Sequence, residues 1–451
     1  MSQTFSRQLA DPGRRLQSAA AVETCASCES PLAGPSQYSR ESDATTQVND
    51  ILAEIVKEVS SGLAGKPAAI LLTGSFARNE GSVLRIEHGL RMLSDVEFLV
   101  VCPPGLAVEG MQRAVDEKAR EISKQLGAKA VECAVEFSAV KHNYFRNLRP
   151  AIFSYELMAH ARTMWGDEGI LASARRFPAS EIPKWDAWRL LNNRLLEQLQ
   201  WADIGPRWGL AELQAAFYHV LKCYLDMATA ILIFTGRYRS RYSERADTLN
   251  AWAQSASGKN APFADELARR VSSCTAFKLN ADFRMHPLGV DLTQEPERFR
   301  ADVRRAIFEL VDIFHQVWCW AGSTIVGLNA KSLKDDAMLQ DAMLRSQSLA
   351  EKLRGWAKLA LMREVRMQPD FLERMSRLLF KGSPRYLTYT VASDLYFLLP
   401  QVMDGKAPEV VSKEDLLPVT FRQDGQDLGR WWRARANVFS GWKLFLRNHW
   451  A

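Results

Sequence analysis

Apolar runs typical of buried β-strands are confined to one short part of this 451-residue chain. Ala68–Leu72 and Val96–Val101 each predict a short strand, and Val131–Val140 predicts a third strand in which apolar and polar residues alternate. Between the last two runs, Val108–Leu126 has the spacing of an amphipathic helix. Strand signals almost vanish further along, where helical spacing takes over. We therefore expect an α+β chain, in which a small mixed-sheet domain precedes a mostly α-helical bundle region.

The chain is too long for a single ordinary core, so several domains are expected. We predict a flexible tail over 1–43, a mixed-sheet domain over 44–180, a helical domain over 181–330 and a C-terminal helical region over 331–451. The tail is polar and shows no sustained period. Further helices are predicted at Thr45–Val59, Trp185–Trp201, Leu210–Phe234, 298–328, 334–365 and 370–380.

The cysteine and charge content favours a cytoplasmic protein. Seven cysteines, an odd number at scattered positions, do not form a disulfide framework. Cys25 and Cys28 form a lone Cys-x-x-Cys without the second pair that a zinc ribbon needs. No signal peptide is visible, and the longest apolar stretch, Leu225–Phe234, is too short to cross a bilayer, so no stable membrane insertion is expected. The net charge of +6 suits a protein that handles anions such as phosphates.

Two acidic residues mark the start of the second predicted strand. Asp95 and Glu97 are two positions apart, so both carboxylates point to the same face. They repel each other unless a cation joins them, and oxygen ligands of this kind suit Mg²⁺. Glu136 lies on the polar face of the third predicted strand and can supply a third carboxylate. Two Mg²⁺ ions about 4 Å apart would then clamp the attacking and leaving oxygens of an in-line displacement.

Gly74 and Ser75, after the first predicted strand, have a complementary role. Glycine lets the backbone approach a phosphate closely, and a helix that begins near Phe76 would present free N–H groups to it. The Ser75 hydroxyl can add a hydrogen bond, and Arg78, one turn later, could reach a phosphate oxygen. Together with the three acids, this turn predicts a site for a nucleoside triphosphate and metal.

This combination of Gly-Ser, Asp-x-Glu on a strand and a lone acid between apolar residues resembles the DNA polymerase β-like nucleotidyltransferase superfamily. The Ser-Asp-x-Glu form is similar to that of aminoglycoside nucleotidyltransferases. The resemblance implies that Gly74 and Ser75 hold the triphosphate, and that Asp95 and Glu97 bind Mg²⁺. It also implies that Glu136 is a third ligand or the general base. ATP is the expected donor, and a helical domain behind the catalytic domain would close the cleft and bind the acceptor.

The sequence departs from the family pattern in two ways. Twenty residues separate Gly74 from Asp95, more than in many members, so residues 81–93 are expected to form a hairpin or flap. Glu132 lies on the same face of the predicted third strand as Glu136. We prefer Glu136 as the third acid of the site because Val135 and Phe137 flank it. In the helical part, Lys222 and Asp226 are an i, i+4 pair that could meet phosphate or acceptor groups, or be an ordinary solvated pair.

Several alternatives stay open. Asp95 and Glu97 could simply be the exposed face of a half-buried strand. The chain could be a catalytically silent nucleotide-binding regulatory protein, or an antitoxin-like partner of another protein. If it is an enzyme, the acceptor is a hydroxyl on a small molecule, a sugar, a protein or an RNA end. The sequence determines neither the nucleobase nor the oligomeric state.

Overall fold

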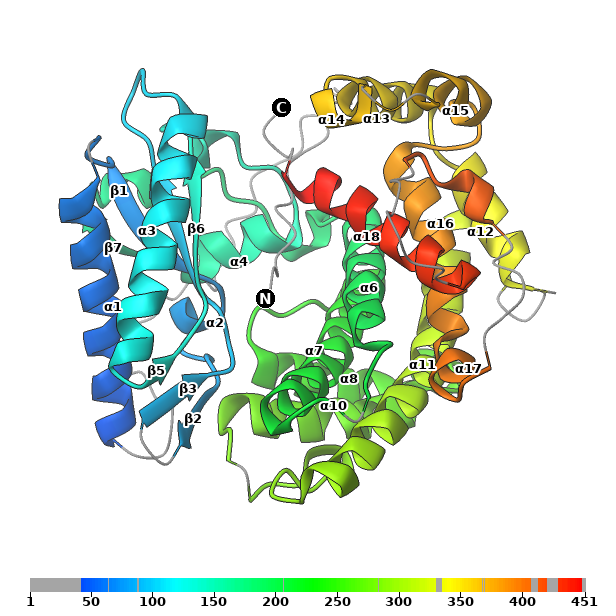
Figure 1. Ribbon diagram of the computed structural model, residues 1–451, viewed down its shortest axis with the longest axis horizontal. Coiled ribbons are helices and arrows are strands. Elements are labelled where there is room, and N and C mark those ends of the chain that lie inside the picture. Colours follow the sequence, from blue (N-terminus) through cyan, green and yellow to red (C-terminus); the bar gives the residue numbers. More distant parts are fainter. Residues whose placement is uncertain are drawn as a thin grey trace. The chain divides into compact units, whose positions relative to one another are not determined.

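The computed structural model describes residues 42–63, 65–86, 89–205, 207–282, 284–329, 335–366, 368, 370–406, 413–419 and 429–447. The chain divides into two compact units, drawn in Figure 1. The first unit contains the described residues up to Phe177 together with Lys278–Asp282, and the second contains Pro178–Phe277 and the described residues from 284 onwards. The residues before and after the predicted domain boundary at 330 belong to the same unit, the second one. Residues 1–41 of the predicted tail, with Cys25 and Cys28, lie outside the described residues, whereas its last two residues, Ser42 and Asp43, begin a helix.

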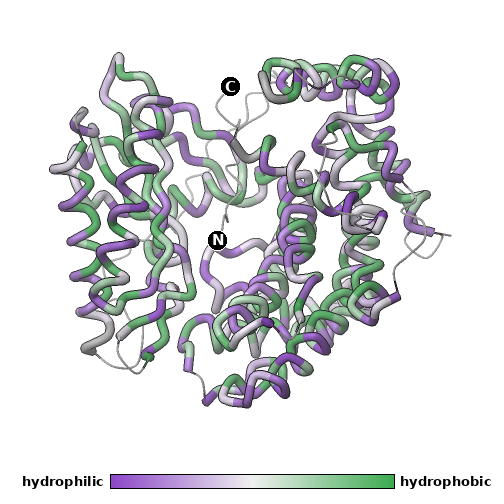
Figure 2. The backbone as a smooth tube through the Cα atoms, viewed as in Figure 1, coloured by the Kyte–Doolittle hydropathy of each residue, from purple (hydrophilic) through white to green (hydrophobic). Residues whose placement is uncertain are grey.

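The α+β class is confirmed, because strands occupy the first unit and helices the second. The first unit contains α1 (Ser42–Gly62), β1 (Ala69–Thr73), α2 (Gly74–Ala77), β2 (Val83–Ile86), β3 (Gly89–Met92), β4 (Val96–Val101), α3 (Val108–Ala128), β5 (Val131–Glu132), β6 (Val135–Val140), η1 (Phe145–Asn147), α4 (Ile152–His160), β7 (Arg162–Gly166) and α5 (Gly169–Ala172). The predicted strand over Val96–Val101 agrees with β4, and the predicted amphipathic helices agree with α1 and α3. Both helices alternate hydrophobic and hydrophilic residues along their length (Figure 2).

The larger sheet has the strand order β6-β4-β1-β7. β1 runs antiparallel to β4 and β7, whereas β4 and β6 are parallel. On one face of this sheet the apolar side chains pack against η1, α4 and α5, and they form a core of Ala69, Leu71, Leu99, Val101, Phe145, Leu148, Leu157 and Ile170. Strand alternation places Thr73, Glu97 and Glu136 on that same face, beyond the end of its apolar lining.

The prediction of one strand over Val131–Val140 was wrong. The chain forms β5 and β6, and β5 pairs with β3 in a second sheet of order β2-β3-β5. Glu132 therefore lies on a different sheet from Glu136, and its carboxylate is 2.5 Å from Nε of Arg91. The alternation of one segment shows which way its side chains point but not which neighbouring strand accepts its backbone hydrogen bonds. The preference for Glu136 over Glu132 gains support from this split.

The segment between Gly74 and Asp95 forms the expected hairpin. β2 and β3 pair in antiparallel register from Val83 opposite Met92 to Ile86 opposite Gly89. The base of the hairpin is closed because the Leu93 amide donates to the Ser82 carbonyl at 2.9 Å. The Ser82 amide in turn donates to Oγ of Ser94 at 2.8 Å. The two ends of the hairpin, at Ser82 and Ser94, are therefore hydrogen-bonded to each other. The long insertion does not separate Asp95 from the turn at Gly74 in space.

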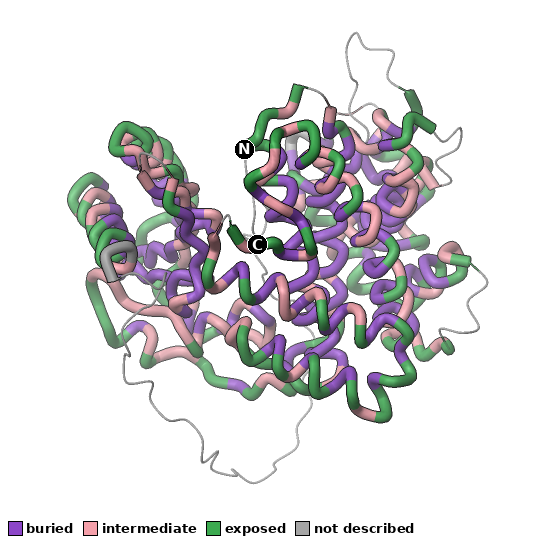
Figure 3. Tube along the Cα trace, turned by 90° about the horizontal axis from the view of Figure 1, so that it is seen from below, coloured by how far each residue is buried: buried purple, intermediate pink, exposed green. Residues whose placement is uncertain are grey.

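The second unit is helical throughout its described residues. Its elements are η2 (Ala179–Glu181), α6 (Lys184–Gln198), η3 (Leu199–Trp201), α7 (Leu210–Phe234), α8 (Tyr242–Ala253), α9 (Ala256–Lys259), α10 (Ala264–Leu279, of which the last two residues belong to the first unit), η4 (Pro287–Gly289), α11 (Pro296–Val326), α12 (Asp336–Arg345), α13 (Leu349–Ala360), α14 (Arg363–Arg366), α15 (Phe371–Leu378), α16 (Pro384–Phe397), α17 (Leu399–Met403), η6 (Glu414–Leu416) and α18 (Arg430–Arg447). Buried residues gather on the inward faces of helices in Figure 3.

One predicted helix is divided. The segment 334–365 forms α12, α13 and α14. A capping box begins α13, because Oγ of Ser348 accepts from the Glu351 amide and the Glu351 carboxylate accepts from the Ser348 amide. A serine followed three residues later by glutamate is a helix start signal that the apolar periodicity alone did not reveal.

The helix α7 is long and apolar enough to cross a membrane by length and composition, unlike the shorter stretch considered in the sequence analysis. However, 89% of its most hydrophobic window is buried inside the structure. It packs against α6 and α11, which also contact each other through the tilted rings of Trp188 and Trp318, with centroids 5.1 Å apart. This burial is typical of the core helix of a soluble protein.

Candidate active site

The predicted acids meet at one end of the larger sheet. Glu97 of β4 is the direct Cα partner of Thr73 on β1 and of Glu136 on β6. Paired residues on neighbouring strands, about 4.8 Å apart, project their side chains from the same face. The structure therefore brings Glu97 and Glu136, 39 positions apart in the sequence, side by side in one row across three strands. Both glutamates are half-buried.

Gly74 lies against the carboxylate of Glu97. Its φ of +67° is in the left-handed region, which glycine adopts without strain. A Cβ added at Gly74 would lie 2.8 Å from the carboxyl carbon and from one carboxyl oxygen of Glu97. Ser75 follows at the start of α2 and is buried. The predicted phosphate turn and the predicted acid thus adjoin, and the left-handed backbone at Gly74 favours glycine there.

Replacing Gly74 by Ala is expected to lower the free energy of unfolding by about 1–2 kcal/mol, the cost of left-handed backbone for an L-residue. It should also displace the Glu97 carboxylate and weaken metal-dependent triphosphate binding. Gly105→Ala is a matched control, because Gly105 has a φ of +84° and no atom within 4 Å of an added Cβ. Urea unfolding and nucleotide titration of both variants give the comparison. Equal triphosphate affinity in the two variants would contradict the close contact.

Asp95 precedes β4 by one residue and is buried, with 8% of its surface exposed. The Val96 amide donates to the Ala134 carbonyl at 2.8 Å, which extends the β4–β6 ladder to this position. Burial, and secondly the negative charge of Asp95, raise the pKa of the neighbouring Cys133 to about 12. The Cys133 thiol therefore stays protonated at neutral pH.

Lys278 is a residue of this region that sequence reasoning missed. Its ammonium donates to Oγ of Ser94 at 2.6 Å, and its carbonyl accepts from Oγ of Ser82 at 2.7 Å. The side chain is buried, with 3% exposed. Lys278 thus ties the base of the hairpin to the residue before Asp95 and places a positive charge next to the start of β4. No local signal could have found it, because it lies 183 positions after Asp95 in the sequence.

Arg78, predicted to contact phosphate, is buried in the structure with 4% of its side chain exposed. Its Nε lies 3.2 Å from the Glu80 carboxylate, and its Nη1 lies 2.5 Å from that of Glu156. Both ion pairs orient the guanidinium toward the two glutamates. The phosphate role of Arg78 stays a prediction, while the ion pairs assign it a stabilising contact between α2 and α4.

Lys222, the other predicted phosphate ligand, lies on α7 in the second unit, half-buried. Its ammonium is 5.6 Å from the centroid of the Tyr218 ring. Asp226, one turn further on, is 2.5 Å from Nη2 of Arg194, which also pairs with Glu197. Asp226 therefore belongs to a largely buried ion-pair network.

No protein-family model, curated protein or solved structure matches this chain. The chemistry of the site therefore follows from its own residues.

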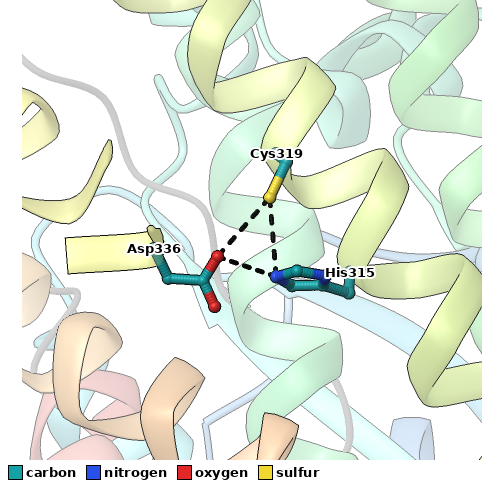
Figure 4. Close-up of side chains that lie close together, drawn as sticks. All are labelled: His315, Cys319 and Asp336. Carbon is teal, nitrogen blue, oxygen red and sulfur yellow. Dashed lines mark hydrogen bonds and ion pairs between the residues drawn. The ribbon is translucent and has the colours of Figure 1, made fainter. Parts of the chain in front are cut away.

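A second group of chemically active side chains lies in the second unit, and the sequence analysis did not single it out. His315 and Cys319 on α11 and Asp336 on α12 point toward one another in Figure 4. Hydrogen bonds from Asp336 and then Cys319 raise the pKa of His315 to about 10. The spacing of His315 and Cys319, four positions apart in a predicted helix, was a signal that could have drawn attention to this pair.

Proposed function

We propose that the chain is a Mg²⁺-dependent nucleotidyltransferase that moves a nucleoside monophosphate from a nucleoside triphosphate to an acceptor hydroxyl. The observation that carries the proposal is the row of Glu97 and Glu136, in direct register on β4 and β6, with Gly74 against the Glu97 carboxylate. The glycine lets the backbone of this turn lie directly beside the Glu97 carboxylate, where a bound metal and a phosphate would adjoin.

The residues of the row fit a hard divalent cation. All the side-chain donors offered by Asp95, Glu97 and Glu136 are carboxylate oxygens, the ligands that Mg²⁺ prefers. When bound, one or two Mg²⁺ ions would neutralise the charge that develops on the triphosphate. Asp95 and Glu97 would hold the metal and orient the triphosphate, and backbone at Gly74 and the Ser75 hydroxyl would contact its phosphates.

Glu136 would hold a metal or accept the proton of the acceptor hydroxyl. The acceptor oxygen then forms a bond to the α-phosphorus, the bond from this phosphorus to the bridging oxygen breaks, and pyrophosphate leaves. Each atom is accounted for: the monophosphate moves to the acceptor, and the hydroxyl proton moves to the carboxylate. ATP is the first donor to test.

The direct test is incubation of the purified chain with α-labelled ATP, GTP, CTP or UTP and cell lysate. We expect Mg²⁺-dependent label on a protein, an RNA or a small molecule, and no label when the γ-phosphate carries it. The fraction that retains the label identifies the class of acceptor. Metal-dependent binding of triphosphates without transfer to any acceptor would instead support a silent nucleotide-binding regulator. A second protein that co-purifies in stoichiometric amount would support the antitoxin-like alternative.

A further inference from the structure

The cluster of His315, Cys319 and Asp336 has the donor set of a transition-metal site. His315 and Cys319 are four positions apart on α11, so they share one face of that helix. Asp336 is the first residue of α12, whose start is fixed because the preceding Asp335 accepts from the Met338 amide at 2.8 Å. Asp335 thus caps the helix, and the Asp336 carboxylate is directed to the α11 pair.

The distances within the cluster suit ligands of a common ion. Sγ of Cys319 lies 3.6 Å from Nε2 of His315 and 3.7 Å from Oδ1 of Asp336. With zinc bond lengths of about 2.3 Å to sulfur and 2.0 Å to nitrogen or oxygen, tetrahedral ligands lie about 3.5 Å apart along the sulfur edges. The remaining edge, from Nε2 of His315 to Oδ1 of Asp336, is 2.7 Å and is a hydrogen bond. A small rotation of either side chain opens it to the roughly 3.3 Å that a shared zinc ion requires.

A nucleophilic relay of cysteine, histidine and aspartate does not fit this arrangement. In such a relay the carboxylate holds one ring nitrogen and the nucleophile meets the other. Here the thiol and the carboxylate both approach Nε2 of His315 (Figure 4). The three donor atoms lie within 4.8 Å of one another, close enough to bind one ion.

We propose that His315, Cys319 and Asp336 form a zinc site with three protein ligands and one open coordination position. A thiolate with an imidazole favours zinc over the magnesium proposed for the carboxylate row. The His315 and Asp336 side chains are 41% and 34% exposed, so an ion and a water molecule can reach the site. Because the ligands come from two helices, bound zinc would also crosslink α11 and α12. This inference is independent of the proposed transferase activity.

The test uses the full chain with Cys25→Ser and Cys28→Ser, so that the Cys-x-x-Cys pair cannot contribute. Zinc is titrated in competition with a chromophoric chelator, and Co²⁺ binding is followed through its thiolate charge-transfer band. We expect a single zinc ion per chain, and a charge-transfer band that Cys319→Ser abolishes. Losing one ligand should weaken zinc binding by more than about 100-fold, since changes to groups that merely orient ligands already cost 10- to 100-fold.

Asp336→Asn is compared with Asp341→Asn, which is the same chemical change at an exposed position of α12. Only Asp336→Asn should weaken zinc binding. A second measurement needs no ligand variant: zinc should slow alkylation of Cys319, followed by mass spectrometry of its peptide. Absence of zinc binding, or undiminished binding in Cys319→Ser, would overturn the proposal. Unchanged alkylation of Cys319 in the presence of zinc would overturn it even if the variants failed to fold.

Discussion

Replacing Asp95 by Asn, or Glu97 by Gln, is expected to reduce nucleotidyl transfer by about a thousandfold. Each change keeps the size of the side chain but removes a negative ligand for the proposed Mg²⁺. The metal stabilises the developing charge by several kcal/mol, and each 1.4 kcal/mol corresponds to a factor of about ten in rate. Transfer of α-label from the preferred triphosphate measures the effect, and circular dichroism verifies that each variant is folded.

Glu132→Gln is the matched control for both changes. Glu132 has the same parity as Glu136 in the sequence, but it is exposed on β5 and pairs with Arg91. We expect it to retain transfer close to that of the unmodified chain. Undiminished transfer in Asp95→Asn and Glu97→Gln would contradict the assignment of Asp95 and Glu97 as metal ligands. Equal losses in all three variants would show that the acids act through the stability of the unit and not through the metal.

Replacing Arg78 by Met should lower the free energy of unfolding by about 3–5 kcal/mol, because it removes the ion pairs that Arg78 makes with the buried Glu80 and with Glu156. The methionine keeps much of the apolar stem, so the loss reports mainly the missing charge. Urea denaturation followed by tryptophan fluorescence gives the value. The double variant Arg78→Met with Glu80→Gln should recover part of the stability, since the buried Glu80 charge is then absent.

Arg113→Met serves as the control for Arg78→Met, because Arg113 is exposed on α3 and its loss should change the unfolding free energy by no more than about 0.5 kcal/mol. A phosphate contact and a stabilising ion pair at Arg78 would differ in their effects on triphosphate binding and on stability. A variant as stable as the unmodified chain but deficient in triphosphate binding would favour the phosphate contact predicted from the sequence. A destabilised variant that binds triphosphate normally while folded would leave only the ion pairs.

The packing of the C-terminal helix α18 depends on a contact between distant segments. Trp431 is 1% exposed and donates from Nε1 to the Leu395 carbonyl at 3.2 Å. This contact joins α18 to α16, which lies more than thirty positions earlier in the sequence.

Local patterns by themselves determined the α+β class, the positions of β1, β4, α1, α3 and α7, and the identity of the acids, because alternation and helical spacing are properties of neighbouring residues. Strand pairing is a contact between distant segments, so the tertiary structure alone decided that β5 leaves the larger sheet and that Glu97 faces Glu136. It likewise decided the close contact of Gly74 with Glu97, the placement of Lys278 beside Ser94, and the meeting of His315 and Cys319 with Asp336. Each of these is a contact between residues that are far apart in the sequence. The pattern of neighbouring residues does not determine which distant segments come together.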